Sequence, residues 1–394
     1  MSDDQDSQSG PYLRRFNPPS DNTEEFEAVL ARRTDVANVC HARTTVEEVP
    51  IYSAPDLRQR RIAEDDWAEV LDEWAGVLKT GAGVFVVEQA YEDHAVLDET
   101  TEIFQQIISE ENQQNLGGDH FAEPGTNDRI WNALEKLGRE DPHVFARYYA
   151  NDIVALASEA WLGPNYQVTS QVNVVRPGAS AQQAHRDYHL GFQTVEDAIG
   201  YPRHVHELSM ALTLQGGIAH CDVPLESGPT RLLPFSQRFE AGYLTYRLGS
   251  YQQLFAERHV ALPLSKGDAL FFNPALYHAA GSNQTADCNR MLNLLQVSSA
   301  FGRAMETVDR VELCNVLYPA LLELTETNQL SPIDAKRAVR CAADGYPFPT
   351  NLDTNPPVDG LAPTTQANLM IDALDNRLDF HQFHSQMVER QQTG

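Results

Sequence analysis

The sequence predicts an α+β fold in which a jelly-roll core of short strands is surrounded by helices from both ends of the chain. Residues of about 166–300 form short apolar runs separated by turn residues, a pattern typical of antiparallel barrels and sandwiches. Residues 64–162 and 304–390 instead carry apolar side chains at three- and four-residue spacing, the period of amphipathic helices. We interpret 26–394 as a single domain that follows a mobile, acidic leader over 1–25.

Before the core, three helices and one short strand are expected. The helices cover 64 to a stop near Gly81, 93–111 and 142–161. The strand is the apolar run Val84-Phe85-Val86-Val87. The polar connection 112–128 is expected to be a surface loop, and its length favours a role as a lid.

Within the core, strands are expected at 166–175, 207–215, 230–234, 260–264, 269–272, 277–278 and 290–298. Pro177-Gly178 ends the first strand and Gly216-Gly217 ends the second. The turn residues Ser265-Lys266-Gly267-Asp268 predict a hairpin between the two strands that flank them. The polar connection after His278 predicts a second hairpin, with the last strand.

After the core the spacing of apolar residues becomes helical again. Helices are expected over 305–325, 332–343 and 366–390. The proline-rich stretch 347–363 separates the last helix from the one before it. The core is therefore expected to lie between two helical flanks.

Charge and cysteine usage exclude several kinds of protein. Against 29 Lys plus Arg stand 56 Asp plus Glu, a formal net charge of -27, which argues against partners such as nucleic acid or an anionic membrane surface. No apolar run approaches the roughly 20 residues that span a bilayer. Five scattered cysteines without a Cys-x-x-Cys pair indicate a reducing compartment. A cytoplasmic protein is expected. Its acidity favours a solvated acidic surface, and a saline habitat or a cationic partner stays open.

Two candidate metal ligands follow the first core strand in Ala184-His185-Arg186-Asp187-Tyr188. In an extended backbone His185 and Asp187 point to the same face, because strand side chains repeat with period two. One more imidazole would complete the two-His-one-carboxylate set that binds Fe(II) and leaves positions open. His278 suits this role, since it ends an apolar run much later in the chain. Arg290 begins the next strand, where its guanidinium could bind a dicarboxylate.

These residues resemble the phytanoyl-CoA dioxygenase family of Fe(II)/2-oxoglutarate-dependent oxygenases, over roughly 84–301. The features that match are Arg176-Pro177-Gly178, His185-Arg186-Asp187, Ser227-Gly228-Pro229-Thr230, Lys266-Gly267-Asp268 and the pair of His278 and Arg290. The resemblance implies a double-stranded β-helix (jelly-roll, cupin-like) core. It also implies a dioxygenase that uses Fe(II), 2-oxoglutarate and O₂ to hydroxylate or otherwise oxidise a small-molecule substrate with release of succinate and CO₂.

The resemblance further implies a catalytic metal site of His185, Asp187 and His278, and a co-substrate site of Arg290, Asn173 and Thr230. Two positions depart from the family pattern. Gln237 stands where members often carry histidine, and Ala280 stands where a small hydroxylated residue is common. Related halogenases replace the carboxylate ligand by a small residue, so the presence of Asp187 favours hydroxylation.

Two residues are expected to contact the substrate. Gln171 lies one strand step before Asn173 on the same face, and His189 follows the metal motif closely. No motif names the substrate.

Plainer interpretations exist for each residue: a structural His–Asp pair, a half-buried strand-end histidine and a surface arginine. Two other functions also stay open, a cupin-like metal-dependent isomerase or lyase and a non-catalytic metal-binding barrel. Arg290 discriminates between these and an oxygenase, because an isomerase needs no arginine for a second carboxylate.

Overall fold

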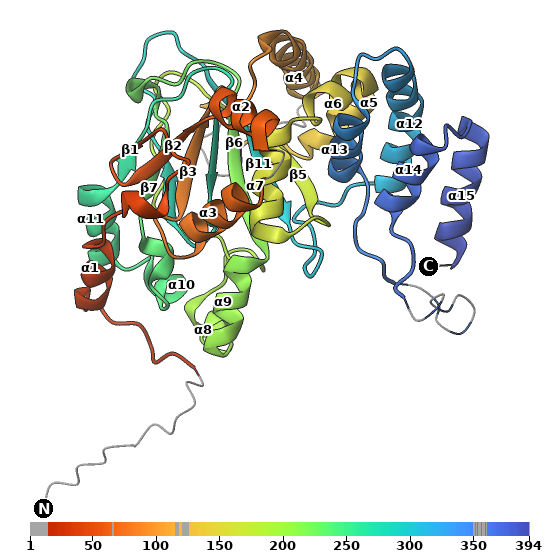
Figure 1. The fold of residues 1–394 in the computed structure, drawn as a ribbon. Helices are drawn as coiled ribbons and strands as arrows, with labels where there is room; N and C mark the ends of the chain where they lie inside the picture. Colours follow the sequence, from red (N-terminus) through yellow and green to blue (C-terminus); the bar gives the residue numbers. More distant parts are fainter. Residues whose placement is uncertain are drawn as a thin grey trace, which may run out of the picture.

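The computed structural model describes residues 15–64, 67–114, 118–119, 126–349, 351, 353, 356, 359 and 361–393. It confirms a mixed fold of helices and sheets with one large sheet (Figure 1). Most of the expected leader and part of the expected lid lie outside the described residues. The end of the expected leader contacts the protein, since the hydroxyl of Tyr251 donates to the carbonyl oxygen of Asn22 at 2.8 Å.

The α-helices are α1 Glu24–Leu30, α2 Ala54–Glu64, α3 Ala68–Lys79, α4 His94–Gln114, α5 Ala133–Glu140, α6 Pro142–Tyr148, α7 Asp152–Leu162, α8 Val195–Ala198, α9 Arg203–Ala211, α10 Gly242–Thr245, α11 Gly249–Arg258, α12 Arg310–Glu326, α13 Pro332–Ala342, α14 Gln366–Asp375 and α15 Phe380–Thr393. Short 3₁₀-helices are η1 Val36–Asn38, η2 Leu225–Ser227 and η3 Ser236–Arg238. The strands are β1 Thr44–Val46, β2 Val49–Ser53, β3 Val84–Glu88, β4 Asn127–Ile130, β5 Gln167–Val175, β6 Thr213–Ala219, β7 Thr230–Leu233, β8 Val260–Ala261, β9 Ala269–Phe272, β10 Tyr277–Ala280 and β11 Arg290–Ser298.

Two sheets pack face to face. Eight strands form the large sheet in the order β1-β2-β3-β9-β6-β11-β5-β4, in which only β2 and β3 pair in parallel. The small sheet has the order β10-β7-β8. Leu232 of β7 shares an apolar cluster with Leu270 of β9 and Leu292 of β11. The inner face of the large sheet is therefore the one that meets the small sheet.

Helices cover the outer face of the large sheet. Trp74 of α3 stacks on Phe85 of β3, with ring centroids 4.7 Å apart. Both rings belong to an extensive apolar cluster that also includes Leu317 of α12. Figure 1 shows α12, α13, α14 and α15 gathered beyond β5 at one end of the molecule. None of the helices in the described part of the chain combines the length and apolar character needed to cross a bilayer.

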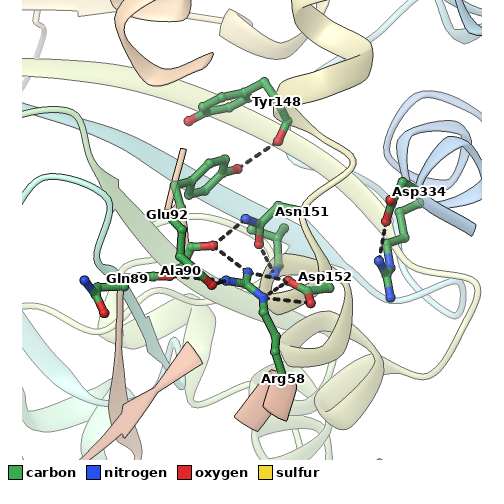
Figure 2. Close-up of polar contacts among 11 residues, drawn as sticks. Arg58, Gln89, Ala90, Glu92, Tyr148, Asn151, Asp152 and Asp334 are labelled. Carbon is green, nitrogen blue, oxygen red and sulfur yellow. Dashed lines mark hydrogen bonds and ion pairs between the residues drawn. The ribbon is translucent and has the colours of Figure 1, made fainter. Parts of the chain in front are cut away.

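An ion-pair network fixes α2 against the outer layer (Figure 2). The guanidinium of Arg58 lies between Asp152 at the start of α7 and Glu92 after β3, and donates to the carbonyl oxygen of Ala90 at 2.9 Å. Asn151 donates to the same carbonyl at 2.8 Å. Three segments distant in sequence are thus held by one partly buried cation.

The prediction of a strand over 207–215 is wrong. Its first half is the end of α9, and β6 starts only at Thr213 and runs through Gly216 and Gly217. Glycine serves close packing here, because a Cβ on Gly216 would lie 2.9 Å from the ring of Phe271 on the neighbouring β9.

Both expected hairpins were also wrong. Strands β8 and β9 flank the predicted turn but belong to different sheets, and the same holds for β10 and β11. The turn itself forms, with Gly267 at φ +92°. Strands β8 and β9 do not hydrogen-bond with each other, because β9 pairs with β3 and β6 of the large sheet. The turn between β8 and β9 therefore leads the chain from one sheet to the other, and so does the connection between β10 and β11.

Two expected helices are each divided in two. The helix over 142–161 is interrupted because Asn151 caps α7, its side chain accepting from the amide of Val154 at 3.0 Å. The helix over 366–390 is interrupted near Arg377, whose φ of +51° cannot continue a right-handed helix. The helix expected over 305–325 begins later, at Arg310, where Asp309 caps it.

Candidate active site

Three side chains able to bind a metal ion meet between the two sheets. His185, Asp187 and His278 each offer one donor atom, and these atoms lie within 4.8 Å of one another. His185 Nε2 lies 3.9 Å from Asp187 Oδ1, and His278 Nε2 lies 3.7 Å from Asp187 Oδ2. Two imidazoles and a carboxylate on one side of a point form the donor set that suits Fe(II).

Backbone pairing brings these residues together. The amide of His185 donates to the carbonyl of His278 at 3.0 Å, and the amide of His278 returns a hydrogen bond at 3.1 Å. The amide of Asp187 donates to the carbonyl of Pro274 at 2.9 Å. The extended backbone places His185 and Asp187 on one face, as the sequence predicts.

Both imidazoles are oriented with Nε2 toward the carboxylate. Nδ1 of His185 lies 3.0 Å from the carbonyl oxygen of Gln183, and Nδ1 of His278 lies 2.9 Å from that of Leu276. A carbonyl oxygen only accepts, so Nδ1 carries the proton in each ring. Each Nε2 therefore presents its lone pair, which is the state needed to bind a metal.

The surroundings of the three donors are partly polar and partly aromatic. Gln215 on β6 donates its Nε2 to Asp187 Oδ2. The ring of Phe272 lies 4.8 Å from that of His278, and the half-exposed Phe192 lies 5.5 Å from His185. Burial lowers the pKa of His278 to about 4, an effect that His185 increases and Asp187 opposes. His278 is therefore neutral at physiological pH.

Arg186 fixes the segment that carries two of the donors. Its side chain is 1% exposed and points away from the metal-ligand cluster into the protein. It donates to the carbonyl oxygens of Ser236 at 2.7 Å and Phe239 at 2.9 Å, and also to that of Ala275. The role of Arg186 could not be predicted from the sequence, because a lone arginine in a motif gives no indication of carbonyl acceptors on distant segments.

Arg290 is a buried cation. None of the described residues that hydrogen-bond to it is acidic. Its side chain is 2% exposed and donates to the carbonyl of Gly228 at 2.6 Å and to Asn173 Oδ1 at 2.9 Å. Its Nε is buried and has no hydrogen-bond partner in the described part of the chain. Burial lowers the pKa of Arg290 to about 10. A carboxylate would satisfy both the charge and the unpaired donor.

A buried polar network extends from Arg290 along the inner face of β5. Asn173 Nδ2 donates to Asp119 at 3.3 Å, and Asp119 pairs with Arg129 of β4 at 3.0 Å. Arg129 donates to Gln171 at 2.8 Å, and Gln171 donates to Glu306 at 3.4 Å. Glu306 Oε2 is buried without a partner among the described residues, and burial raises the pKa of this carboxyl group. Asp119, Arg129 and Glu306 could not be predicted from the sequence, because each lies outside any motif.

The family model of phytanoyl-CoA dioxygenase (PhyH) matches residues 80–292, more than half of the chain. The chain belongs to the phytanoyl-CoA dioxygenase family. The resemblance drawn from the residue motifs is thereby confirmed. Among curated proteins, none matches this sequence.

Several solved structures match this family member at low sequence identity. The non-heme α-ketoglutarate-dependent epimerase SnoN from nogalamycin biosynthesis matches with 17% identity and a TM-score of 0.44, over 60% of this chain and 85% of SnoN. The carbocyclase SnoK from the same biosynthesis matches with 19% identity and a TM-score of 0.42, over 58% of this chain and 83% of SnoK. These distant matches say nothing of the substrate.

The remaining residues expected from the sequence lie in different places. Thr230 pairs with Ala280, which lies two residues after His278 on β10. Thr230 and His278 therefore face the same side of the small sheet. His189 is not part of the metal-ligand cluster, and its Nδ1 lies 3.0 Å from the hydroxyl of Thr213. Burial lowers the pKa of His189.

Proposed function

We propose that this member of the family is an Fe(II)/2-oxoglutarate-dependent dioxygenase that hydroxylates, or otherwise oxidises, a small-molecule substrate. The single observation that carries the proposal is the convergence of His185, Asp187 and His278 donor atoms within 4.8 Å. The hydrogen bonds of both Nδ1 atoms to carbonyl oxygens support it, because they leave two lone pairs beside a carboxylate.

In this proposal the three side chains bind ferrous ion on one face. Bound iron, 2-oxoglutarate and O₂ supply the oxidising power, with release of succinate and CO₂. Gln215 holds one oxygen of Asp187 and so orients the carboxylate. Phe272, whose ring lies beside that of His278, and Leu232, which pairs with His278 in the β7–β10 register, place apolar side chains next to the site.

Arg290 is proposed to bind the far carboxylate of 2-oxoglutarate. The unpaired, buried Nε and the lack of a hydrogen-bonded acid within the described residues support this role. Asn173 holds Nη2 of the guanidinium in place, and Thr230 is a further co-substrate contact on the small sheet. Gln171 and His189 are proposed to face the substrate.

We also propose that the two facing sheets are the double-stranded β-helix predicted from the sequence, within a single oxygenase domain over 26–394. The shared cluster of Leu232, Leu270 and Leu292 supports the first part. The packing of Leu317 of α12 in one cluster with Val172 of β5 supports the second.

The proposal is tested by succinate formation from 2-oxoglutarate with Fe(II) and ascorbate. The wild type should release succinate, and His185→Ala and Arg290→Ala should fall to the background of the assay. His384→Ala, which changes an exposed histidine on α15, should match the wild type. Equal succinate in all four proteins would favour a metal-dependent isomerase or a non-catalytic barrel instead.

A further inference from the structure

A second cluster of metal-binding donors lies outside the candidate active site. Cys40 Sγ, a ring nitrogen of His41 and a carboxylate oxygen of Glu73 lie within 4.8 Å of one another. Cys40 and His41 follow η1, whereas Glu73 belongs to α3. A thiol, an imidazole and a carboxylate from two separate segments thus face one point.

The large sheet separates this cluster from the candidate active site. Tyr52 of β2 donates its hydroxyl to Glu73 Oε1 at 2.8 Å and packs in the outer apolar cluster. The preceding Ile51 packs in the inner cluster with Phe272, whose ring contacts that of His278. The two groups of donors therefore lie on opposite faces of the sheet, and the inference does not depend on the proposed function.

Two distances, one within the cluster and one from His41 to the neighbouring Glu69, are close to those of a tetrahedral zinc site. Zn²⁺ binds thiolate, imidazole and carboxylate at about 2.0–2.3 Å, which places neighbouring ligand atoms roughly 3.3–3.8 Å apart. Cys40 Sγ lies 3.2 Å from Glu73 Oε2, and His41 Nε2 lies 3.7 Å from Glu69 Oε2. Glu69 stands one turn before Glu73 on α3, and its side chain is 88% exposed, so it can adjust its position freely.

We propose that Cys40, His41 and Glu73 bind Zn²⁺ on the outer face of the large sheet. Glu69 supplies the fourth ligand. The carboxylate of Glu73 is already held for this role, because Tyr52 and the backbone amide of His41 both donate to it. On binding, the Sγ–H bond of Cys40 breaks and its proton passes to solvent, so that Sγ and Glu73 Oε2 both turn lone pairs to the metal. The metal would join the segment after η1 to α3.

Among the side chains that the structure describes, Arg60 is a basic group that faces the cluster. Nη1 of the exposed Arg60 lies 3.3 Å from His41 Nδ1. A guanidinium only donates, so Nδ1 accepts here and Nε2, the nitrogen beside Glu69, carries the ring proton. For zinc to take Nε2, Arg60 turns into solvent, Nε2 gives its proton to water and Nδ1 takes one up, so the ring stays neutral. Because its charge repels a cation, Arg60→Ala should tighten zinc binding, whereas loss of a ligand should weaken it.

Cobalt can test the site without enzyme activity. The full chain is stripped of metal with a chelator and titrated with Co²⁺, and the near-ultraviolet charge-transfer absorption of a cobalt–thiolate bond is recorded. His185, Asp187 and His278 contain no sulfur, so only a cysteine site produces this band. The wild type and His185→Ala should both show the band, and Zn²⁺ should abolish it by displacing cobalt. Cys40→Ser should lack it, whereas Cys288→Ser, which changes another partly exposed thiol, should keep it.

Zinc affinity is measured on the same proteins by competition with a coloured chelator. Cys40→Ser should lose more than about 100-fold in affinity, since even loss of an outer hydrogen-bond partner costs 10–100-fold. Circular dichroism of each variant checks that it is folded. Absence of the band in the folded wild type, or its persistence in Cys40→Ser, would overturn the proposal.

Discussion

The guanidinium of Arg186 occupies the space that any side chain at Gly242 would need. A Cβ atom on Gly242 would lie 1.8 Å from Arg186 Nη1 and 2.2 Å from Cζ. The same guanidinium lies over the rings of Tyr243 and Tyr277, at 5.0 and 5.3 Å from their centroids. A glycine at the start of α10 thus allows a buried cation to anchor the segment between His185 and Asp187.

Gly242→Ala should destabilise the protein by about 3 kcal/mol, the upper end of the range for overpacking, because Arg186 cannot move without losing three carbonyl acceptors. Urea unfolding measures the change. Gly249→Ala is the matched control, since Gly249 is exposed and a Cβ there meets nothing within 4 Å. The control should stay within about 0.5 kcal/mol of the wild type. Equal stability of both variants would contradict the packing argument.

Gln215→Leu should lower the affinity for Fe(II) by about 10–100-fold, because the amide that orients Asp187 is lost. Iron bound per chain at limiting Fe(II) measures this effect. Gln296, directly opposite Gln215 in the β6–β11 register, is the matched control, and Gln296→Leu should bind iron normally. Normal iron binding by a folded Gln215→Leu would show that Asp187 needs no partner.

Arg290→Lys should raise the KM for 2-oxoglutarate by about 10-fold or more, because an ammonium group lacks the planar pair of donors that fits a carboxylate. Arg310 is a suitable control, since it is also buried and, in the described part of the chain, donates to the carbonyl oxygens of Val168, Cys341 and Ala342 but to no side chain. Arg310→Lys should lower the melting temperature without changing this KM. A similar rise in both variants would point to a general loss of structure.

His220 should make stability fall as the pH is lowered from 7 to 5. Burial lowers its pKa to about 3, while Thr101 and Tyr148 hold both ring nitrogens at 2.8 Å; nearby Lys266 lowers the pKa further and Asp98 opposes this. The unfolded chain binds a proton below its ordinary pKa of about 6.5, whereas the folded protein does not bind it until about pH 3.

The free energy of unfolding should therefore drop by about 2 kcal/mol between pH 7 and pH 5 from this residue alone. His220→Gln should lower stability at pH 7 but lose about 2 kcal/mol less over the same interval. Urea unfolding at the two pH values measures the difference. An identical pH dependence in both proteins would show that His220 takes up its proton over the same pH range in the folded protein as in the unfolded chain.

Local patterns predicted single elements well. The run of β-branched residues that became β5, and the spacing of Trp74, Val77 and Leu78 that became α3, depend on neighbours in sequence. Pairing partners were harder to predict. The strands before and after Gly267 belong to different sheets, because β9 hydrogen-bonds with β3 and β6 and not with β8.

In the candidate site, too, some features follow from neighbouring residues and others from distant contacts. His185 and Asp187 share a face through the two-residue period of extended backbone, which sequence alone expresses. Gln215 and Arg186 could not be found, because their roles depend on hydrogen-bond acceptors far along the chain. Arg129 and Glu306 became visible only when β4 and the segment after β11 met beside Gln171.

By itself the sequence determined the family and the residue types able to bind a metal and a carboxylate, because motif spacing and side-chain chemistry are properties of short segments. Only the tertiary structure decided that His185 pairs with His278, that Arg290 is buried without an acid bonded to it in the described residues, and that Cys40 meets Glu73. Each of these depends on which distant segments satisfy one another's backbone hydrogen bonds and apolar surfaces, and no local pattern records that choice.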